Sequence, residues 1–428
     1  MRFTRTIGVV AAAGIAIGAL AGCSSDGSGD KGGEKGGDVE LTVTWWGNES
    51  RIEKYEKSFD IFEEEHPGVQ ITGVPSDYGS YWTSRSTEGA ARELPDLMQF
   101  DPNLAKYAKN GLLLDLTEYV GDTIDFTNVD ENIVKGAQID GVQYGVPFGI
   151  GTFALFVNKA LVEKAGVEML EPDYTWEELN AWIGEITAAG VTNDKGQPVY
   201  GGNDHGAATQ LFYQWLAQKG IEPWDGETPG FTQQDIVDYL SLEDEGLENG
   251  SFYPIDRTTQ VAPLDGFSMN ESASSLTFAS FYGRYAPEVG AENIVMLPVP
   301  SGDSGEKAMW FAPSNYAIGA NTEHPEEATE LADFLARDAR VAEIFGTDRG
   351  VMVDNETRAG FEPQEGTGDE EVLAYVDGVQ QYATAVTPDT PENFSSYEAE
   401  WLRLNEERMY GNITAEEFAE QWWTEAGL

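Results

Sequence analysis

The chain has 428 residues, of which 75 are Asp or Glu and only 25 are Lys or Arg, so its formal net charge at pH 7 is −50. The negative electrostatic field of such a protein repels nucleic acid and anionic lipid surfaces, so neither is expected as a binding partner of the protein surface as a whole. The simplest interpretation of the charge is a solvated acidic surface that keeps the protein in solution.

The first 22 residues have the features of a secretion signal. Arg2 and Arg5 supply a positive start, and residues 7–20 form an unbroken run of 14 small or apolar residues. A helix needs about 20 apolar residues to cross a bilayer, so this run is too short to span one. It has the length of the apolar core of a signal peptide, and we expect residues 1–22 to be one.

Cys23 is the only cysteine of the chain, and it directly follows Leu20-Ala21-Gly22. This segment resembles the lipobox of bacterial lipoproteins, in which the cysteine thiol receives a diacylglycerol before cleavage. Two acyl chains anchor a protein stably where one does not. We therefore expect a lipid anchor at Cys23 and a protein held outside the cytoplasm, on the outer face of a bacterial cell membrane. Without a second cysteine no internal disulfide forms, so the fold depends on its core.

The segment that follows the cysteine differs in composition from the rest of the chain. Residues 24–38 contain six Gly and three Ser among mixed charges, and such a composition cannot bury apolar surface. With Cys23 it predicts a flexible linker over 23–38, with a reach of about 20 Å. The 390 residues from 39 to 428 are too many for one ordinary core, so two lobes are expected.

Short β-branched and apolar segments recur after the linker. Predicted strands cover residues 39–46, 69–74 and 96–100. Asp140 and Gly141, set between apolar residues, predict a hairpin turn.

Helical spacing separates these strands. Ser50 and Glu53 form a capping box that predicts a helix start, and two more helices are predicted over 78–92 and 102–111. The apolar residues that should turn the first helix toward the core are Ile52, Tyr55, Phe59 and Phe62. The alternation of strand and helix predicts an α/β fold with a mostly parallel sheet and helices on both faces.

Three long segments of the chain resemble one family. They are VTWWGNESRIEKYEKSFDIFEEEHPGVQIT at 43–72, YWTSRSTEGAARELPDLMQFDPNLAKYAKNGLLLDL at 81–116 and DGVQYGVPFGIGTFALFVNKALVEKAG at 140–166. The resemblance continues in PEEATELADFLARD and in the acidic tail ITAEEFAEQWW, so it covers nearly all of residues 39–428. These segments are similar to the extracellular solute-binding proteins of family 1, the carbohydrate-binding lipoproteins of ABC sugar importers.

The resemblance implies a two-lobe fold of the type II periplasmic-binding-protein class, in which each lobe is a mixed, mostly parallel sheet flanked by helices. It places three crossovers near residues 148–153, 272–276 and 313–317. The implied division assigns 39–150 to the first lobe, 151–273 to the second, 274–314 to the first again, and 315–428 to the second lobe with the C-terminal helices.

The function implied by the resemblance is transport-linked binding without covalent chemistry. A monomer would close its lobes over a carbohydrate, because only the closed form contacts the sugar from both sides. The several aromatic candidates suggest a di- or oligosaccharide rather than a single ring. It would then deliver the sugar to ABC transporter permease subunits, with an ATPase on the cytoplasmic side. No cofactor or metal is expected, and the membrane would be a partner only through the lipid anchor.

Sugar rings have apolar faces and polar rims, so a sugar site needs aromatic side chains together with carboxylates and amides. Strand alternation sends Trp45 and Trp46 to opposite faces, and we predict that Trp46 faces the ligand at the carboxyl end of its strand, where open α/β sheets bind ligands. Asn48 follows directly. Asp101 ends a neighbouring strand, and capping the helix after it is an equally good interpretation of that residue.

Further candidates lie on the predicted helices and loops. On the helix over 78–92, the spacing allows Tyr78, Tyr81 and Trp82 to share roughly one side. We favour Tyr81 as ligand-facing, with core packing as the alternative for one or two of the three. In the second lobe Trp224 lies in the turn-rich segment EPWDGETPG. Trp310 and Phe311 precede the last crossover, where relatives often place cleft residues. Arg349 is a weaker candidate, because Val351 follows Gly350 where many relatives have Pro.

A loop and two motifs complete the candidates. Asp204, between Asn203 and His205, fits either a helix cap or a ligand contact, and capping is slightly favoured. The dinucleotide fingerprint that starts at Gly149 leads into strand-like FALFV rather than a helix, so it predicts a crossover instead. The three His are too far apart in sequence for a typical metal-ligand spacing.

Two alternative functions remain open at this point. With 75 acidic residues, a carboxylate pair could form by chance, as in a secreted, lipid-anchored, glycan-active hydrolase. The same two-lobe fold could also bind a solute other than a sugar.

Overall fold

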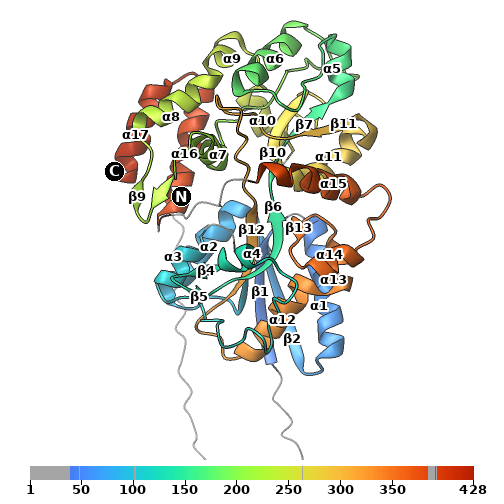
Figure 1. Cartoon of the computed structure of the whole chain (residues 1–428), viewed down its shortest axis with the longest axis vertical. Helices are drawn as coiled ribbons and strands as arrows, with labels where there is room; N and C mark the ends of the chain where they lie inside the picture. Colours follow the sequence, from blue (N-terminus) through green and yellow to red (C-terminus); the bar gives the residue numbers. More distant parts are fainter. Residues whose placement is uncertain (1–38, 48, 101–102, 263, 384–390, 392) are drawn as a thin grey trace, which may run out of the picture. The chain divides into compact units, whose positions relative to one another are not determined.

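The computed structural model describes residues 39–47, 49–100, 103–262, 264–383, 391 and 393–428 (Figure 1). The predicted signal peptide, Cys23 and the linker lie outside the described residues, as do Asn48 and Asp101. No helix within the described ranges is long and apolar enough to cross a membrane.

A six-stranded sheet organises the first lobe, with strand order β13-β6-β12-β3-β1-β2. Its strands are β1 (Val39–Trp46), β2 (Val69–Ser76), β3 (Leu97–Phe100), β6 (Val146–Gly151), β12 (Ala312–Ile318) and β13 (Val351–Met352). β1 pairs parallel with β2 and β3, whereas β12 is antiparallel to both β3 and β6. The three strands predicted from the sequence are confirmed. The sheet is mixed, but the prediction that it is mostly parallel is wrong, because β12 and β13 both run antiparallel to the strands they pair with.

Both faces of this sheet are covered by helices. One core contains Leu41, Val43 and Trp45 of β1, packed with residues of α1 (Glu49–Glu65), α12 (Pro325–Arg337) and α13 (Ala339–Phe345). The opposite face packs against α2 (Tyr78–Ala91) and α3 (Leu104–Lys109). The remaining elements of the lobe are α4 (Glu131–Lys135), α14 (Asn355–Gly360), β4 (Gln138–Ile139) and β5 (Val142–Gln143).

Local predictions in this lobe succeed except at one helix start. Tyr55, Phe59 and Phe62 of α1 are buried as predicted. β4 and β5 form the predicted hairpin, with positive φ at both turn residues. The capping box at Ser50 is wrong, because α1 already begins at Glu49 and Ser50 lies in its first turn.

A three-stranded sheet organises the second lobe. β7 (Phe153–Asn158) is its central strand and pairs antiparallel with β10 (Ser274–Phe278) and β11 (Ile294–Leu297). The assignment of 274–314 to the first lobe is therefore wrong for β10 and β11, and no crossover occurs near 272–276. The physical reason is that β7 is buried along its whole length, so its backbone polar groups need hydrogen-bonded neighbours on both sides.

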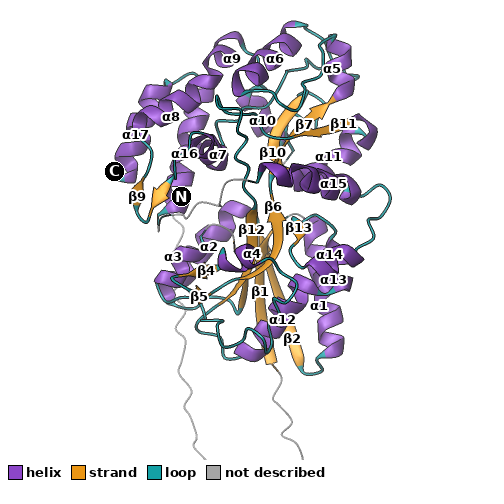
Figure 2. Ribbon diagram, in the orientation of Figure 1, coloured by secondary structure: helices purple, strands orange, loops and turns teal. Residues whose placement is uncertain are grey.

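The chain passes between the sheets at three places. β6 leads into β7 through Thr152, and Figure 2 shows β6 extending from the first sheet toward the second. The return precedes Ala312, which pairs with Gly151 of β6. Because β12, α12, α13 and β13 then complete the first lobe, the assignment of 315–428 entirely to the second lobe is wrong as far as α14. The last passage joins α14 to α15 (Asp369–Val379).

The second lobe is mainly helical around an aromatic core. Its α-helices besides α15 are α5 (Lys159–Ala165), α6 (Trp176–Ala188), α7 (Thr209–Gln218), α8 (Gln233–Leu240), α9 (Asp244–Asn249), α10 (Ile255–Val261), α11 (Tyr282–Val289), α16 (Phe394–Met409) and α17 (Ala415–Ala426). Its short elements are β8 (Trp224–Asp225), β9 (Thr228–Pro229), η1 (Ser241–Glu243), η2 (Ala279–Phe281), η3 (Ala291–Asn293) and η4 (Gln380–Tyr382). The side chains of Trp176, Phe212, Trp401 and Trp422 are buried in one core, which ties the C-terminal helices to the lobe.

Candidate functional site

The candidate site lies at the carboxyl end of β1, on the sheet face covered by α2. Trp46 is the last residue of β1 and is half-buried, with its ring packed against the core beneath α2. Trp45 points to the opposite face, where its ring centroid lies 4.2 Å from that of Tyr55. Of the two indoles that the sequence offered, only Trp46 is therefore placed to meet a ligand.

Trp46, Tyr78, Tyr81 and Trp82 form what we call the aromatic cluster. The Trp46 ring centroid lies 5.4 Å from Tyr78, 5.1 Å from Tyr81 and 6.0 Å from Trp82. The contacts with both tyrosines are edge-to-face, which is a favourable aromatic geometry. Tyr78 is 38 % exposed and Tyr81 is 0 % exposed. The cluster therefore extends from the core at Tyr81 to the surface at Tyr78, and Trp46 contacts both.

Tyr81 has a supporting position in this cluster. Its hydroxyl donates a hydrogen bond of 2.7 Å to the backbone oxygen of Gln99 and lies 3.4 Å from the hydroxyl of Thr44. Burial raises the pKa of the Tyr81 hydroxyl, so it stays protonated. The predicted direct ligand contact would need this buried ring to move, whereas in the present position it fixes the orientation of Trp46.

The backbone at the end of β1 is fixed by an arginine. Arg51 donates from Nη1 to the carbonyl oxygen of Trp46 over 3.1 Å, and from Nη2 to Oδ1 of Asp348 over 3.0 Å. Gly47 has no side chain between them, and a Cβ there would lie 2.6 Å from Cδ of Arg51. The loop that contains Asp348 is thereby attached to the candidate site.

Arg349 occupies the interior of the first lobe. Its guanidinium carbon lies 3.6 Å from the ring centroid of Phe345 and 4.9 Å from that of Phe148. It also donates to the hydroxyl of Tyr316 and, over 3.1 Å, to the carbonyl of Leu335. Its donors are thus directed into the core, where they stabilise the packing of the loop on the sheet.

Trp310 and Phe311 lie where the chain returns to the first lobe. Trp310 is 4 % exposed, and its carbonyl accepts a hydrogen bond of 3.2 Å from the hydroxyl of Thr152. Its ring contacts Phe153 edge-on, and its indole nitrogen is buried without a hydrogen-bond partner among the described residues. Phe311 is partly buried against the core of the second lobe.

Trp224 is buried in the second lobe rather than exposed on a loop. It is 5 % exposed, stacks on Tyr397 at 5.7 Å and donates from its indole nitrogen to the hydroxyl of Tyr213 over 3.0 Å. The turn-rich sequence is a short β8–β9 hairpin whose tryptophan packs onto α16. The structure therefore brings Trp46 and Tyr81 together, and it places Trp224 with the C-terminal helices.

Sequence reasoning places Tyr78 on the same side of its helix as Tyr81 but prefers Tyr81, and it misses Arg51. The structure reverses that preference, because Tyr78 is exposed whereas Tyr81 is buried. Arg51 did give a signal, because a cation in the first turn of a helix opposes the helix dipole and needs a compensating partner. That partner, Asp348, is distant in sequence and could not be identified without the fold.

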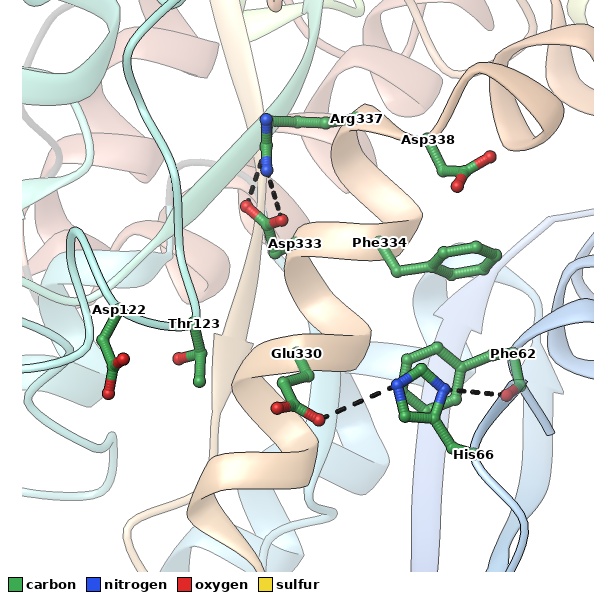
Figure 3. Close-up of a pocket in the computed structure, with 9 residues that line it drawn as sticks. All are labelled: Phe62, His66, Asp122, Thr123, Glu330, Asp333, Phe334, Arg337 and Asp338. Carbon is green, nitrogen blue, oxygen red and sulfur yellow. Dashed lines mark hydrogen bonds and ion pairs between the residues drawn. The ribbon is translucent and has the colours of Figure 1, made fainter.

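A cavity of about 430 Å³ lies elsewhere on the first lobe (Figure 3). Figure 3 shows His66 against Phe62 on one side and α12 in the middle, with Arg337 bonded to both oxygens of Asp333. His66 follows the carboxyl end of α1, whereas Trp46 precedes its amino end, so the cavity and the aromatic cluster lie at opposite ends of that helix. In the described ranges no group of three or more His, Cys, Asp or Glu could hold a metal ion.

Comparison with known proteins identifies the family. The profile of the family described as "Bacterial extracellular solute-binding protein" matches residues 57–353. The chain belongs to this family. An uncharacterized ABC transporter extracellular-binding protein of Pyrococcus horikoshii is 25 % identical over 379 residues, which cover 81 % of this chain and 80 % of that protein.

Two solved structures show the fold of this solute-binding protein. The ABC substrate-binding protein Lmo0181 of Listeria monocytogenes, solved with cycloalternan, has a TM-score of 0.75 at 18 % identity and covers 91 % of this chain and 98 % of its own. An oligogalacturonide-binding protein of Yersinia enterocolitica, solved with digalacturonic acid, has a TM-score of 0.75 at 19 % identity, with 90 % and 97 % covered. The predicted type II periplasmic-binding-protein fold is confirmed.

The loop of Asp204 and His205 forms a buried ionic network in the second lobe. Arg408 of α16 donates to Glu243 over 2.9 Å, and Glu243 accepts from the backbone amides of His205 and Gly206 over 2.6 and 3.0 Å. Asp204 accepts a hydrogen bond of 3.0 Å from Asn405 of α16. The network attaches α16 to this loop.

The charges of this network are set by burial and by neighbouring groups. Burial, followed by the charge of Glu243, raises the pKa of Asp204 to about 6. Burial likewise lowers the pKa of His205, which favours the neutral ring. Burial also opposes ionisation of Glu243, but His205, Arg408 and the backbone amide of His205 lower its pKa overall. Of the two carboxyl groups, Asp204 is therefore the one whose pKa is raised, and Glu243 the one whose pKa is lowered.

This arrangement predicts a pH-dependent effect of Asp204→Asn. The folded pKa of about 6 lies above the ordinary value of 3.8, so the stabilising contribution of the protonated carboxyl is complete below the ordinary value and is lost as the pH rises from there through 6. The neutral amide should therefore raise the free energy of unfolding by about 2 kcal/mol more at pH 7 than at pH 4.

Urea unfolding at pH 4, 5, 6 and 7 measures this effect. Asp238→Asn, at an exposed position of α8, is the control and should show no such trend. A gain for Asp204→Asn that is equal at pH 4 and pH 7 would contradict the assignment.

Proposed function

We propose that this solute-binding protein captures a carbohydrate of two or more rings between its lobes and delivers it to the permease subunits of an ABC transporter. The observation that carries the proposal is the half-buried Trp46 with the exposed Tyr78 edge-on to it, at the carboxyl end of β1. An indole held in this way offers a rigid apolar surface to the C–H face of a sugar ring.

The comparisons support a sugar as the ligand class. The neighbours from Listeria and Yersinia were solved with cycloalternan and digalacturonic acid, both of which are carbohydrates of more than one ring. The net charge of −50 disfavours the uronate of the second case, because it repels an anionic ligand. We therefore favour a neutral di- or oligosaccharide.

The remaining parts of the proposed site come from both lobes. Asn48 and Asp101 are proposed to bind sugar hydroxyls from the first lobe, and Phe311 to add an apolar contact from the side of the second lobe. Trp310 would fix the crossing next to Phe311 through its carbonyl. Binding of this kind requires no bond to be made or broken, so the protein acts as a receptor and not as a hydrolase.

The receptor proposal predicts saturable binding to one member of a saccharide panel. The panel consists of maltose, maltotriose, cellobiose, cycloalternan and digalacturonic acid. At least one neutral member should raise the unfolding temperature, because a ligand that binds only the native state stabilises it. Trp46→Ala should weaken its affinity, measured by calorimetry, by about ten-fold or more, equivalent to about 1.4 kcal/mol.

Trp423→Ala is the matched control for this prediction. Trp423 of α17 is also half-buried and aromatic-packed, so its loss should reduce stability without changing affinity. Equal affinity of Trp46→Ala and the wild type would remove Trp46 from the site. Release of shorter saccharides from any panel member would instead identify a hydrolase.

We also propose that Cys23 anchors the protein to the membrane through a diacylglycerol. The support is the Leu20-Ala21-Gly22-Cys23 sequence behind an apolar run of 14 residues. In a bacterial expression host, Cys23→Ala should move the protein from the membrane fraction to the soluble fraction, and the wild-type N-terminal peptide should carry the lipid mass. A membrane-bound Cys23→Ala protein would contradict the proposal.

A further inference from the structure

Arg51 combines two features that are unfavourable for a cation. It lies in the first turn of α1, where the helix dipole disfavours positive charge, and its side chain is only 17 % exposed. Burial alone would lower the pKa of Arg51, but the neighbouring carboxylate of Asp348 raises it overall. The same contact lowers the pKa of Asp348 against the effect of burial. The carboxylate of this loop thus compensates the charge of Arg51.

The contacts of Arg51 use the full width of its guanidinium. Nη1 donates to the carbonyl of Trp46 over 3.1 Å, Nη2 donates to the carbonyl and Oδ1 of Asp348 over 2.7 and 3.0 Å, and Nε donates to Oδ2 over 3.3 Å. Lys54, one turn further along α1, lies 3.5 Å from the same carboxylate. Only a planar guanidinium group, with a fork of several N–H donors at fixed angles, can bond the end of a strand and a loop at the same time in this way.

The loop held by Arg51 is bonded on its other side to the second lobe. The amide and the hydroxyl of Thr347 both donate to Oδ1 of Asp369 over 2.8 Å. Gly346, at φ +56°, has no room for a Cβ, which would lie 2.5 Å from the Asp369 carboxylate. Asp369 is the first residue of α15, and the hydroxyl of Tyr375 on that helix donates to the carbonyl of Phe153 over 2.6 Å.

We propose that Arg51 is a positioning residue that couples the end of β1, and with it the proposed sugar platform, to the amino end of α15 in the second lobe. The path runs from the Trp46 carbonyl through Arg51 and Asp348 to Thr347 and Asp369. Closure of the lobes over a ligand would then affect Trp46 through these hydrogen bonds and the peptide bond between Thr347 and Asp348. The identity of the platform rests on the proposed function, whereas the coupling is a property of the ligand-free protein.

Hydrogen exchange in the ligand-free protein tests the coupling. Three amides report along the path: Gly47 donates to Ser76, Thr347 to Asp369, and Val372 to Gly368. Arg51→Lys keeps the charge but loses the fork, so exchange at all three amides should accelerate by about three-fold or more. Arg340→Lys, which alters a comparable fork on Glu65 and Asp338 in the first lobe, should leave all three unchanged.

Faster exchange at Gly47 alone, or at none of the three amides, would overturn the proposal. In that case Arg51 would stabilise only the end of β1 and would not affect the second lobe. Asp348→Asn should reproduce the result of Arg51→Lys, and it decides the question if the lysine variant does not fold. In the saccharide panel, Arg51→Lys should also weaken the binding that the wild type shows by about three-fold or more. If the wild type binds no panel member, the proposed function fails, while the exchange rates still decide the coupling.

Discussion

The hydrogen bond from the Thr152 hydroxyl to the carbonyl oxygen of Trp310 joins the two neighbouring segments by which the chain passes between the lobes. These segments continue as β6 and β12, which pair from Gly151 and Ala312 onward in the first sheet. Each lobe has its own sheet, so a closing motion of the lobes would be concentrated at the few residues of these crossings. The proposed ligand site depends on this arrangement, because a receptor that closes needs stiff lobes and a short, well-defined hinge.

The first lobe fixes one wall of the proposed site before any ligand arrives. Tyr81 is immobilised by its bond to Gln99 and holds Trp46 from below, while Arg51 holds the Trp46 backbone from the side. An indole that is already oriented loses little conformational entropy on binding, which favours affinity for a weakly bound ligand such as a sugar. The same arginine contacts Asp348, and the neighbouring Thr347 of that loop donates a hydrogen bond to Asp369 at the start of α15. The proposed site is thus connected by hydrogen bonds to the second lobe.

The sequence predicts the features that depend on residues close together along the chain. The β-branched alternation of residues 39–46 identified β1 and separated the roles of Trp45 and Trp46, and helical spacing identified the buried face of α1. It could not predict features that depend on partners distant along the chain. β10 and β11 were assigned to the wrong lobe because only β7 reveals their pairing. Trp224 was expected on an exposed loop because its partner Tyr397 lies 173 positions further on. Similarly, only the fold shows that Arg349 is directed into the core and that Tyr81 lies beneath Trp46 rather than beside the ligand.

The central claim is that two lobes close over a saccharide held at the end of β1. Small-angle X-ray scattering on the purified protein, with and without the panel saccharide that most stabilises it, tests this claim most directly. The account predicts a smaller radius of gyration at saturation, with the saccharide recovered intact. An unchanged radius of gyration at saturation, or recovery of a cleaved saccharide, would contradict it.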